Sequence, residues 1–126
     1  MKVEDLEVYK KLFALALEVD KITLDFPKHE MYELGSQLRR SSNSAPANLA
    51  ECFGNKHTNI YTEGISRAQG EIKETTHHLK MAQSKGYLNS TQLNYLVKEY
   101  DICLLQLYAL EKSLYNNKRK QLTTNN

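Results

Sequence analysis

The chain has 126 residues, and its 40% apolar and 25% charged content suits one hydrophobic core beneath a charged surface. Cys52 and Cys103 are too few for a disulfide framework and do not form a Cys-x-x-Cys pair, so we expect reduced, packed thiols. The N-terminus shows no secretory signal, and no apolar run reaches the roughly 20 residues that span a bilayer. We therefore predict a cytoplasmic protein with no membrane partner.

The formal net charge is only +2, which argues against a dedicated nucleic-acid coat. The charge is unevenly distributed, however. Residues 1–54 contain seven Lys/Arg and nine Asp/Glu, whereas residues 55–126 contain ten and six. The basic second part permits a surface that faces a polyanion.

A first helix is predicted from Asp5 to Asp25, where Pro27 follows and stops it. Apolar residues recur at spacings of four and three, which keeps one stripe against a partner helix. That stripe consists of Val8, Leu12, Leu15, Val19, Ile22 and Phe26. Tyr9, Phe13 and Ala16 are expected to widen it, as contact with two neighbouring helices requires.

The second helix is predicted from Glu30 to Phe53, with Gly54 ending it. Its middle is small and polar and contains Pro46, so a loop is the competing interpretation. Because the apolar spacing resumes in register after Pro46, we predict one kinked helix. Its inward residues are Met31, Leu34, Leu38, Ala45, Leu49 and Phe53.

The third helix is predicted from Thr58 to Lys85, with the spacing of four and three held for three heptads. Its inward residues are Tyr61, Ile65, Ala68, Ile72, Thr75, Leu79 and Ala82. Glycine is unfavourable in a helix interior, so at Gly64 and Gly70 a neighbouring backbone is expected to approach closely.

A fourth helix is predicted to open at a capping box formed by Asn89 and Gln92 and to end after Tyr115. Its inward residues are Leu93, Val97, Tyr100, Leu104, Leu107 and Leu114, with Leu96, Cys103 and Leu110 beside them. Residues 117–126 are polar, and we predict a disordered tail.

Short connections force neighbouring helices to run antiparallel. The predicted fold is therefore an all-α, up-down-up-down four-helix bundle with a Pro-kinked second helix. Residues 1–116 are expected to form its single domain.

The residues give little reason to expect catalysis. Glu74 and His77 form a Glu-x-x-His pair of the kind that binds metal in di-iron bundles, but such sites need a second pair and further carboxylates. A solvated helix face carrying Glu74, His77 and His78 is the favoured alternative. Phosphate loops and nucleophile elbows are missing from the sequence. We predict a non-enzyme with no cofactor, no metal and no catalytic residue.

Polar residues flank Pro46, with Arg39 and Arg40 before it and Asn48 and Glu51 after it. They could contact a partner, or an RNA backbone through the arginines. The structural alternative is that Asn48 and Glu51 bind carbonyl groups that Pro46 leaves without a donor.

Two further candidates for nucleic-acid or partner binding are Lys56 and Arg67. The run Lys118–Lys120 could complement the helix dipole or contact a nucleic acid. Tyrosines, including Tyr108, could stack on bases, although tyrosine at the edge of a core is commoner.

Several motifs resemble the "four helix bundle protein" family, also known as the S23 ribosomal protein-like family of intervening sequences in 23S ribosomal RNA genes. They are Asp5-Leu6-Glu7-Val8-Tyr9, Phe26-Pro27-Lys28, Tyr32-Glu33-Leu34, Gln37-Leu38-Arg39-Arg40-Ser41, Ser44-Ala45-Pro46-Ala47-Asn48-Leu49-Ala50-Glu51, Gly54, Ala68, Gly70, Glu74 and Gly86-Tyr87-Leu88. Cys52 stands where this family usually has Gly, Thr76 where Glu is common, and Lys85 where Leu is common.

The resemblance implies a compact four-helix bundle that assembles into a homo-pentamer. It also implies distant kinship with the accessory variability protein of diversity-generating retroelements, a basic bundle that binds nucleic acid and a reverse transcriptase. The first functional hypothesis is thus an oligomeric scaffold for RNA, DNA or a nucleic-acid enzyme. The alternatives are a protein-only interaction module and, with least support, a metal-dependent enzyme using Glu74 and His77.

Overall fold

The computed structural model describes the backbone of residues 1–124 and the side chains of residues 1–120. It contains the helices α1 (Glu7–Thr23), α2 (Leu34–Cys52), α3 (Thr58–Ser84) and α4 (Ser90–Thr124). Two short 3-10 helices, η1 (Val3–Asp5) and η2 (Lys28–Glu30), precede α1 and α2. Residues 1–124 contain no strand. The predicted all-α four-helix bundle is confirmed.

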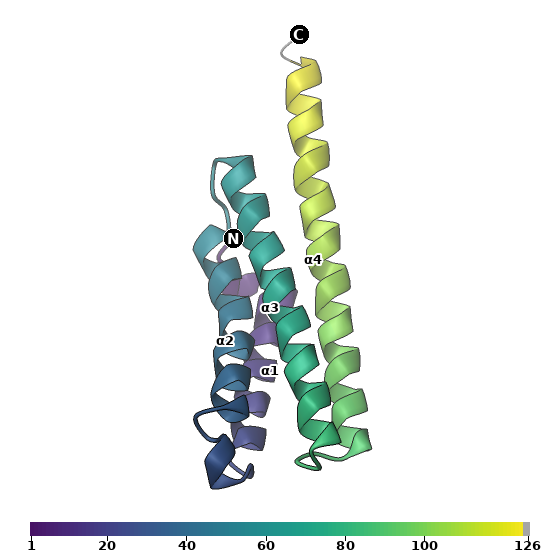
Figure 1. Cartoon of the computed structure of the whole chain (residues 1–126). Coiled ribbons are helices and arrows are strands. Elements are labelled where there is room, and N and C mark those ends of the chain that lie inside the picture. Colours follow the sequence, from purple (N-terminus) through teal and green to yellow (C-terminus); the bar gives the residue numbers. More distant parts are fainter. Residues whose placement is uncertain (125–126) are drawn as a thin grey trace.

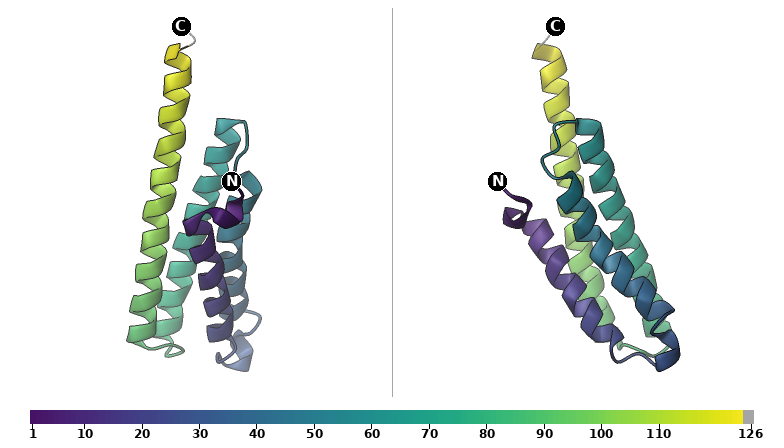
Figure 2. Two further views of the ribbon diagram at one scale, coloured as in Figure 1. Left: turned by 180° about the vertical axis from the view of Figure 1, so that it is seen from behind. Right: turned by 90° about the vertical axis from the view of Figure 1, so that its left-hand side faces the viewer.

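The four helices lie side by side, and consecutive helices run in opposite directions (Figure 1). The most extensive contact is between α2 and α3, and the smallest between neighbouring helices is that of α1 with α4. The N-terminal end of α1 leans away from the other helices in the right-hand view of Figure 2.

The core consists of the inward stripes of the four helices. Its fully covered side chains include Leu12, Val19, Leu38, Leu49, Ile65, Ile72, Leu79, Leu96, Tyr100, Cys103 and Leu107. Each fully buried Leu or Ile contributes about 1.5–3 kcal/mol relative to an exposed one. Two predicted inward residues prove wrong: Phe13 is 51% exposed and Met31 is 44% exposed.

The starts of two helices differ from the prediction. α1 begins at Glu7, because residues Val3–Asp5 form the 3-10 helix η1. Residues 28–30 form η2 instead of the first turn of α2, which begins at Leu34. α2 is one continuous helix through Pro46, as predicted. The kink at Pro46 stays a prediction.

Helix ends are set by local chemistry. Gly54 and Gly86 have positive φ angles of 74° and 84°, a conformation that favours glycine, at the turns after α2 and α3. The predicted capping box is confirmed. The Gln92 N–H donates to Asn89 Oδ1 at 2.8 Å, and the Asn89 N–H donates to Gln92 Oε1 at 3.0 Å.

α4 is longer than predicted. It has 35 residues and continues to Thr124, so the predicted end after Tyr115 is wrong (Figure 1). The residues after Tyr115 include neither glycine nor proline, the usual helix-ending residues. Lys118 Nζ also donates to Asn59 Oδ1 at 3.0 Å and holds this part of α4 beside α3. The domain limit at residue 116 and the disorder of residues 117–126 stay predictions.

The buried carboxylate of Glu30 bonds two connections together at one end of the bundle. Glu30 Oε2 accepts hydrogen bonds from Lys85 Nζ and from the Tyr87 hydroxyl, each at 2.8 Å. The Tyr87 ring also packs on Phe26, with ring centroids 5.1 Å apart. These contacts, which we call the Glu30 latch, join the α1–α2 connection to the α3–α4 turn.

Candidate functional site

Three of the predicted site residues meet in one depression, which we call the α2–α3 hollow. The last turns of α2 and the first turns of α3 form it, and its volume is about 160 Å³. It is lined by Asn48, Glu51, Cys52, Asn55, Ile60, Glu63, Gly64 and Arg67. The sequence thus identified Asn48, Glu51 and Arg67 but not the acidic residue that faces Arg67.

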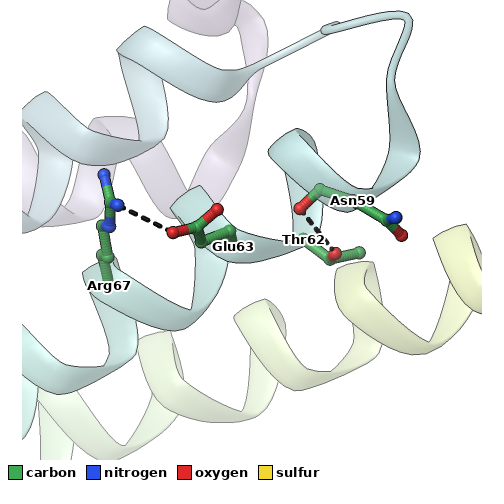
Figure 3. Close-up of polar contacts among 4 residues, drawn as sticks. All are labelled: Asn59, Thr62, Glu63 and Arg67. Carbon is green, nitrogen blue, oxygen red and sulfur yellow. Dashed lines mark hydrogen bonds and ion pairs between the residues drawn. The ribbon is translucent and has the colours of Figure 1, made fainter.

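The side chains that line the α2–α3 hollow carry a net negative charge. Arg67 Nη2 donates to Glu63 Oε1 at 2.7 Å, one turn earlier in α3 (Figure 3). Glu51 adds a second carboxylate to the lining. Phosphate groups favour an excess of cations, so this hollow is better suited to a polar or cationic group of a protein.

Asn48 has a local structural role. Its side-chain Nδ2 donates to the Ser44 carbonyl oxygen at 2.8 Å. In a regular helix, the carbonyl that Pro46 leaves without a donor is the one four residues earlier, that of Ser42. The structural alternative, in which Asn48 binds a carbonyl released by Pro46, therefore does not describe the Asn48 contact.

Arg39 is half-buried and bonds to other parts of the chain. Its Nη1 donates to Thr23 Oγ1 at 3.1 Å, and its Nη2 donates to the Met31 carbonyl oxygen at 2.6 Å. The side chain thereby ties α2 to the end of α1 and to the loop before α2. Its guanidinium group is consequently committed to intramolecular contacts.

The remaining two predicted cations lie apart from the α2–α3 hollow. Arg40 is exposed on α2, and Lys56 is exposed in the turn before α3. Across from Arg40, burial lowers the pKa of His78, and the Arg40 charge acts in the same direction. The six predicted residues therefore do not form one continuous site.

Metal binding and nucleophilic chemistry require particular arrangements among the side chains of residues 1–120. Within the described residues, no group of three or more His, Cys, Asp or Glu side chains is placed to hold a metal ion. Both cysteines are free and buried, and burial raises the pKa of Cys103 to about 11. A thiol with such a pKa stays protonated at neutral pH and is a poor nucleophile.

A basic surface that the sequence analysis mostly missed lies along α3 and α4. Lys118 contacts Asn59, and Lys80 lines a depression with Leu93, Val97 and Lys98 of α4. Lys73 lies one heptad from Lys80 on the same side of α3. We call the surface formed by Lys73, Lys80, Lys98, Lys112 and Lys118 the α3–α4 lysine face.

Aromatic rings accompany these lysines. Tyr108 and Tyr115 are 41% and 49% exposed. With Lys112 between them, they follow spacings of four and three and share one side of α4. The nearby acidic residues are Asp101 and Glu111. The signal in the sequence was the seven-residue repeat of lysines and tyrosines on the outer sides of two adjacent helices.

These features define a class of protein, a small four-helix bundle with polar and charged hollows on its outer faces. None of the helices in residues 1–124 is long and apolar enough to cross a membrane.

The profile of the 23S rRNA-intervening sequence protein family matches residues 4–122. The chain belongs to this family, as the sequence motifs indicated. No curated protein matches the chain.

Proposed function

We propose that this protein is a non-enzymatic, oligomeric scaffold that binds RNA through the α3–α4 lysine face. The observation that carries the proposal is that Lys80 of α3 and Lys98 of α4 line one depression. Helical spacing places Lys73 on the same side of α3, and Lys112 with the half-exposed Tyr108 and Tyr115 on one side of α4. The family name, which refers to intervening sequences of 23S rRNA, makes RNA the favoured nucleic acid.

The chemistry of the lysine face fits a single strand or a loop. Lysine ammonium groups bind phosphate oxygens without regard to sequence. Tyrosine rings stack on unpaired bases, and each such contact is worth about 1–3 kcal/mol. The spacing of Tyr108, Lys112 and Tyr115 alternates these two kinds of contact along one helix.

Assembly would strengthen such binding. The family resemblance implies a homo-pentamer, and several copies would present several lysine faces to one RNA. Linked sites bind a common ligand more tightly than separate ones because later contacts become intramolecular. We accordingly include a homo-oligomer in the proposal.

The test is fluorescence anisotropy with a labelled single-stranded RNA over a salt series starting near about 50 mM. The logarithm of the binding constant should fall linearly with the logarithm of salt concentration, by about 0.7 for each phosphate contacted. The double variant Lys80→Ala/Lys98→Ala should bind more weakly and reduce that slope by about 1.4.

Tyr108→Ala/Tyr115→Ala should weaken binding and leave the salt slope unchanged, because stacking releases no counterions. The matched control is Lys21→Ala/Lys28→Ala, which removes two exposed lysines from the α1 side of the molecule. Equal losses in the control and in Lys80→Ala/Lys98→Ala, or no binding by the unmodified protein at low salt, would reject the proposal.

A second candidate function is that of a protein-only interaction module that uses the α2–α3 hollow. The supporting observation is its polar lining with two carboxylates and one ion-paired arginine. A cationic group of a protein partner would match that charge. Under this hypothesis, the unmodified protein should capture a defined protein partner even after nuclease treatment. Glu51→Lys should abolish that capture and leave RNA binding unchanged.

A further inference from the structure

The depression between α3 and α4 belongs to the lysine face, and we call it the α3–α4 hollow. It is lined by Lys80 of α3, by Lys98 of α4 and by apolar side chains that include Leu93, Val97 and Ile102. Its volume of about 380 Å³ falls within the range of about 300–1,000 Å³ that is typical of small-ligand sites. The hollow is therefore large enough to receive one planar ring system against an apolar lining.

One carboxylate also lines the α3–α4 hollow, that of Asp101. It is exposed, and within the described residues it has no ion pair and no side-chain hydrogen bond. Lys98 lies three residues earlier in α4, a spacing that permits an ion pair, yet the described side chains form none between these two residues. A negative charge repels phosphate groups, so the Asp101 carboxylate suits a different part of a nucleotide.

Asp101 is also the exception in a longer pattern on α4. Exposed residues follow one another at spacings of four and three along one side of this helix. They are Asn94, Lys98, Asp101, Leu105, Tyr108, Lys112 and Tyr115. Asp101 is the one acidic residue among them, and it lies in line with lysines and tyrosines of the proposed RNA-binding surface. A strand that follows this side of α4 passes over Asp101.

A carboxylate distinguishes unpaired bases by the donors on their Watson–Crick edges. Guanine presents two adjacent donors there, N1–H and the N2 amino group, which match the two acceptor oxygens of a carboxylate. Adenine and cytosine each present one amino donor beside an acceptor nitrogen, and uracil presents its N3–H between two carbonyl oxygens. Because a carboxylate repels a neighbouring acceptor, guanine is the base that complements Asp101.

We propose that the α3–α4 hollow selects an unpaired guanine in the bound RNA, whose Watson–Crick edge donates two hydrogen bonds to the Asp101 carboxylate. The apolar lining contacts the base, and Lys80 and Lys98 bind the phosphates on either side of it. A paired guanine uses the same edge for cytosine, so the selected guanine lies in a loop, a bulge or a single strand. This inference rests on the proposed RNA binding and adds a preference for one base.

The test is fluorescence anisotropy with a short labelled oligouridine in which one central uridine is replaced by guanosine, adenosine, cytidine or inosine. A bidentate contact to a base discriminates by roughly 5- to 150-fold in the dissociation constant. Because Asp101 is exposed, we expect the guanosine oligonucleotide to bind about five- to tenfold more tightly than the adenosine and cytidine ones. Inosine lacks the N2 amino group and should lose most of this advantage.

Asp101→Asn should remove the guanosine preference, because the amide keeps one acceptor oxygen and turns an amino group toward the guanine donors. Its affinity for unsubstituted oligouridine should not fall, since the loss of a negative charge favours polyanion binding. The matched control is Glu111→Gln, which removes the same charge from α4 at a residue that does not line the α3–α4 hollow. This control should keep the guanosine preference.

The outcomes separate guanine selection from RNA binding itself. A guanosine preference that inosine and Asp101→Asn each abolish, and that Glu111→Gln retains, would support the proposed contact. Equal binding of all the oligonucleotides, or a preference that persists in Asp101→Asn, would overturn guanine selection and leave RNA binding by the lysine face in place. If the unmodified protein binds none of the oligonucleotides at low salt, the proposed function and this inference both fail.

Discussion

At the scale of single residues, positions that depart from the family pattern have specific partners in the structure. Cys52, where the family usually has glycine, packs against Gly64 of α3. A Cβ atom at Gly64 would lie far inside van der Waals contact with the Cys52 Cβ. Lys85, where leucine is common, binds the buried Glu30 at 2.8 Å. These two side chains are each accommodated by a residue from another helix or connection.

Gly64→Ala should destabilise the protein by about 1–3 kcal/mol, because the added methyl group meets Cys52 on a helix that is itself packed. Gly70→Ala is the matched control. No atom lies within 4 Å of a Cβ at that position, so alanine should stabilise α3 by about 0.5–1 kcal/mol. Urea unfolding measures both changes. Equal effects at the two glycines would contradict the close approach.

The Glu30 latch should make stability depend on pH. The hydrogen bonds from Lys85 and then from Tyr87 hold the pKa of Glu30 below its ordinary value. A lowered folded-state pKa means that the latch stabilises the fold above the unfolded-state pKa of about 4.3, and that this contribution is lost as the pH falls through the folded-state pKa. Glu30→Gln should therefore lower the melting temperature at pH 7 much more than near pH 3.

The control for the latch is Glu33→Gln, because Glu33 is exposed nearby. Its melting temperature should follow that of the unmodified protein across the same pH range. A Glu30→Gln difference that stays constant from pH 7 to pH 3 would show that the carboxylate charge is not the source of the stability.

At the scale of elements, the pairing of α2 with α3 combines apolar contact with one buried polar link. Thr75 Oγ1 lies 2.8 Å from Ser41 Oγ, and both side chains are fully buried. The same hydroxyl lies 2.8 Å from the Glu71 carbonyl oxygen. Because a buried hydroxyl must find partners within the protein, this link helps to set how α2 and α3 align.

Thr75→Val should cost about 1–2 kcal/mol, since it keeps the shape of the side chain but removes the bond to Ser41. The double variant Thr75→Val/Ser41→Ala should lose less stability than the sum of the two single variants. Thr75→Val leaves the buried Ser41 hydroxyl without its partner, and Ser41→Ala removes that hydroxyl. Thermal unfolding of the four proteins of the cycle measures the coupling. Thr76→Val, half-buried next to it, should change stability by less than about 0.5 kcal/mol.

At the scale of the whole molecule, the bundle separates its surfaces. The lysine face occupies α3 and α4, the carboxylate-rich hollow lies between α2 and α3, and exposed apolar side chains, Phe13 and Leu17, lie on α1. A net charge of only +2 hides this separation because acidic and basic residues cancel in the total. Binding of a polyanion depends on the local charge of one face and not on the sum.

A chain cut after Asn116 should fold and unfold cooperatively, with a free energy of unfolding within about 1 kcal/mol of that of the full chain. The cut removes the exposed contact of Lys118 with Asn59 but none of the buried core described above. It should also weaken RNA binding, because it removes Lys118 from the lysine face together with the neighbouring cations Arg119 and Lys120. Loss of cooperative unfolding in circular dichroism would contradict the predicted domain limit at residue 116.

The features that the sequence predicted well are those controlled by neighbouring residues. Helical spacing identified four helices and most of their inward stripes, and Asn89 with Gln92 predicted the cap of α4. The end of α4 was harder to predict, because residues after Tyr115 are polar yet compatible with a helix. Gly70 shows the same limit. A close neighbour was predicted at Gly64 and at Gly70, and of these two positions Gly64 has one and Gly70 does not.

The tertiary structure decided which charged and apolar side chains face each other across helices. The sequence left Arg39 among the cations available to a partner, whereas its guanidinium group bonds to Thr23 and to the Met31 carbonyl oxygen. The same holds for Phe13, which was expected to widen the core stripe of α1 but is 51% exposed in the packed bundle. The sequence by itself determined the helices and the core, because both follow from local periodicity. The binding surfaces depend on contacts between distant residues, which only the packed bundle brings together.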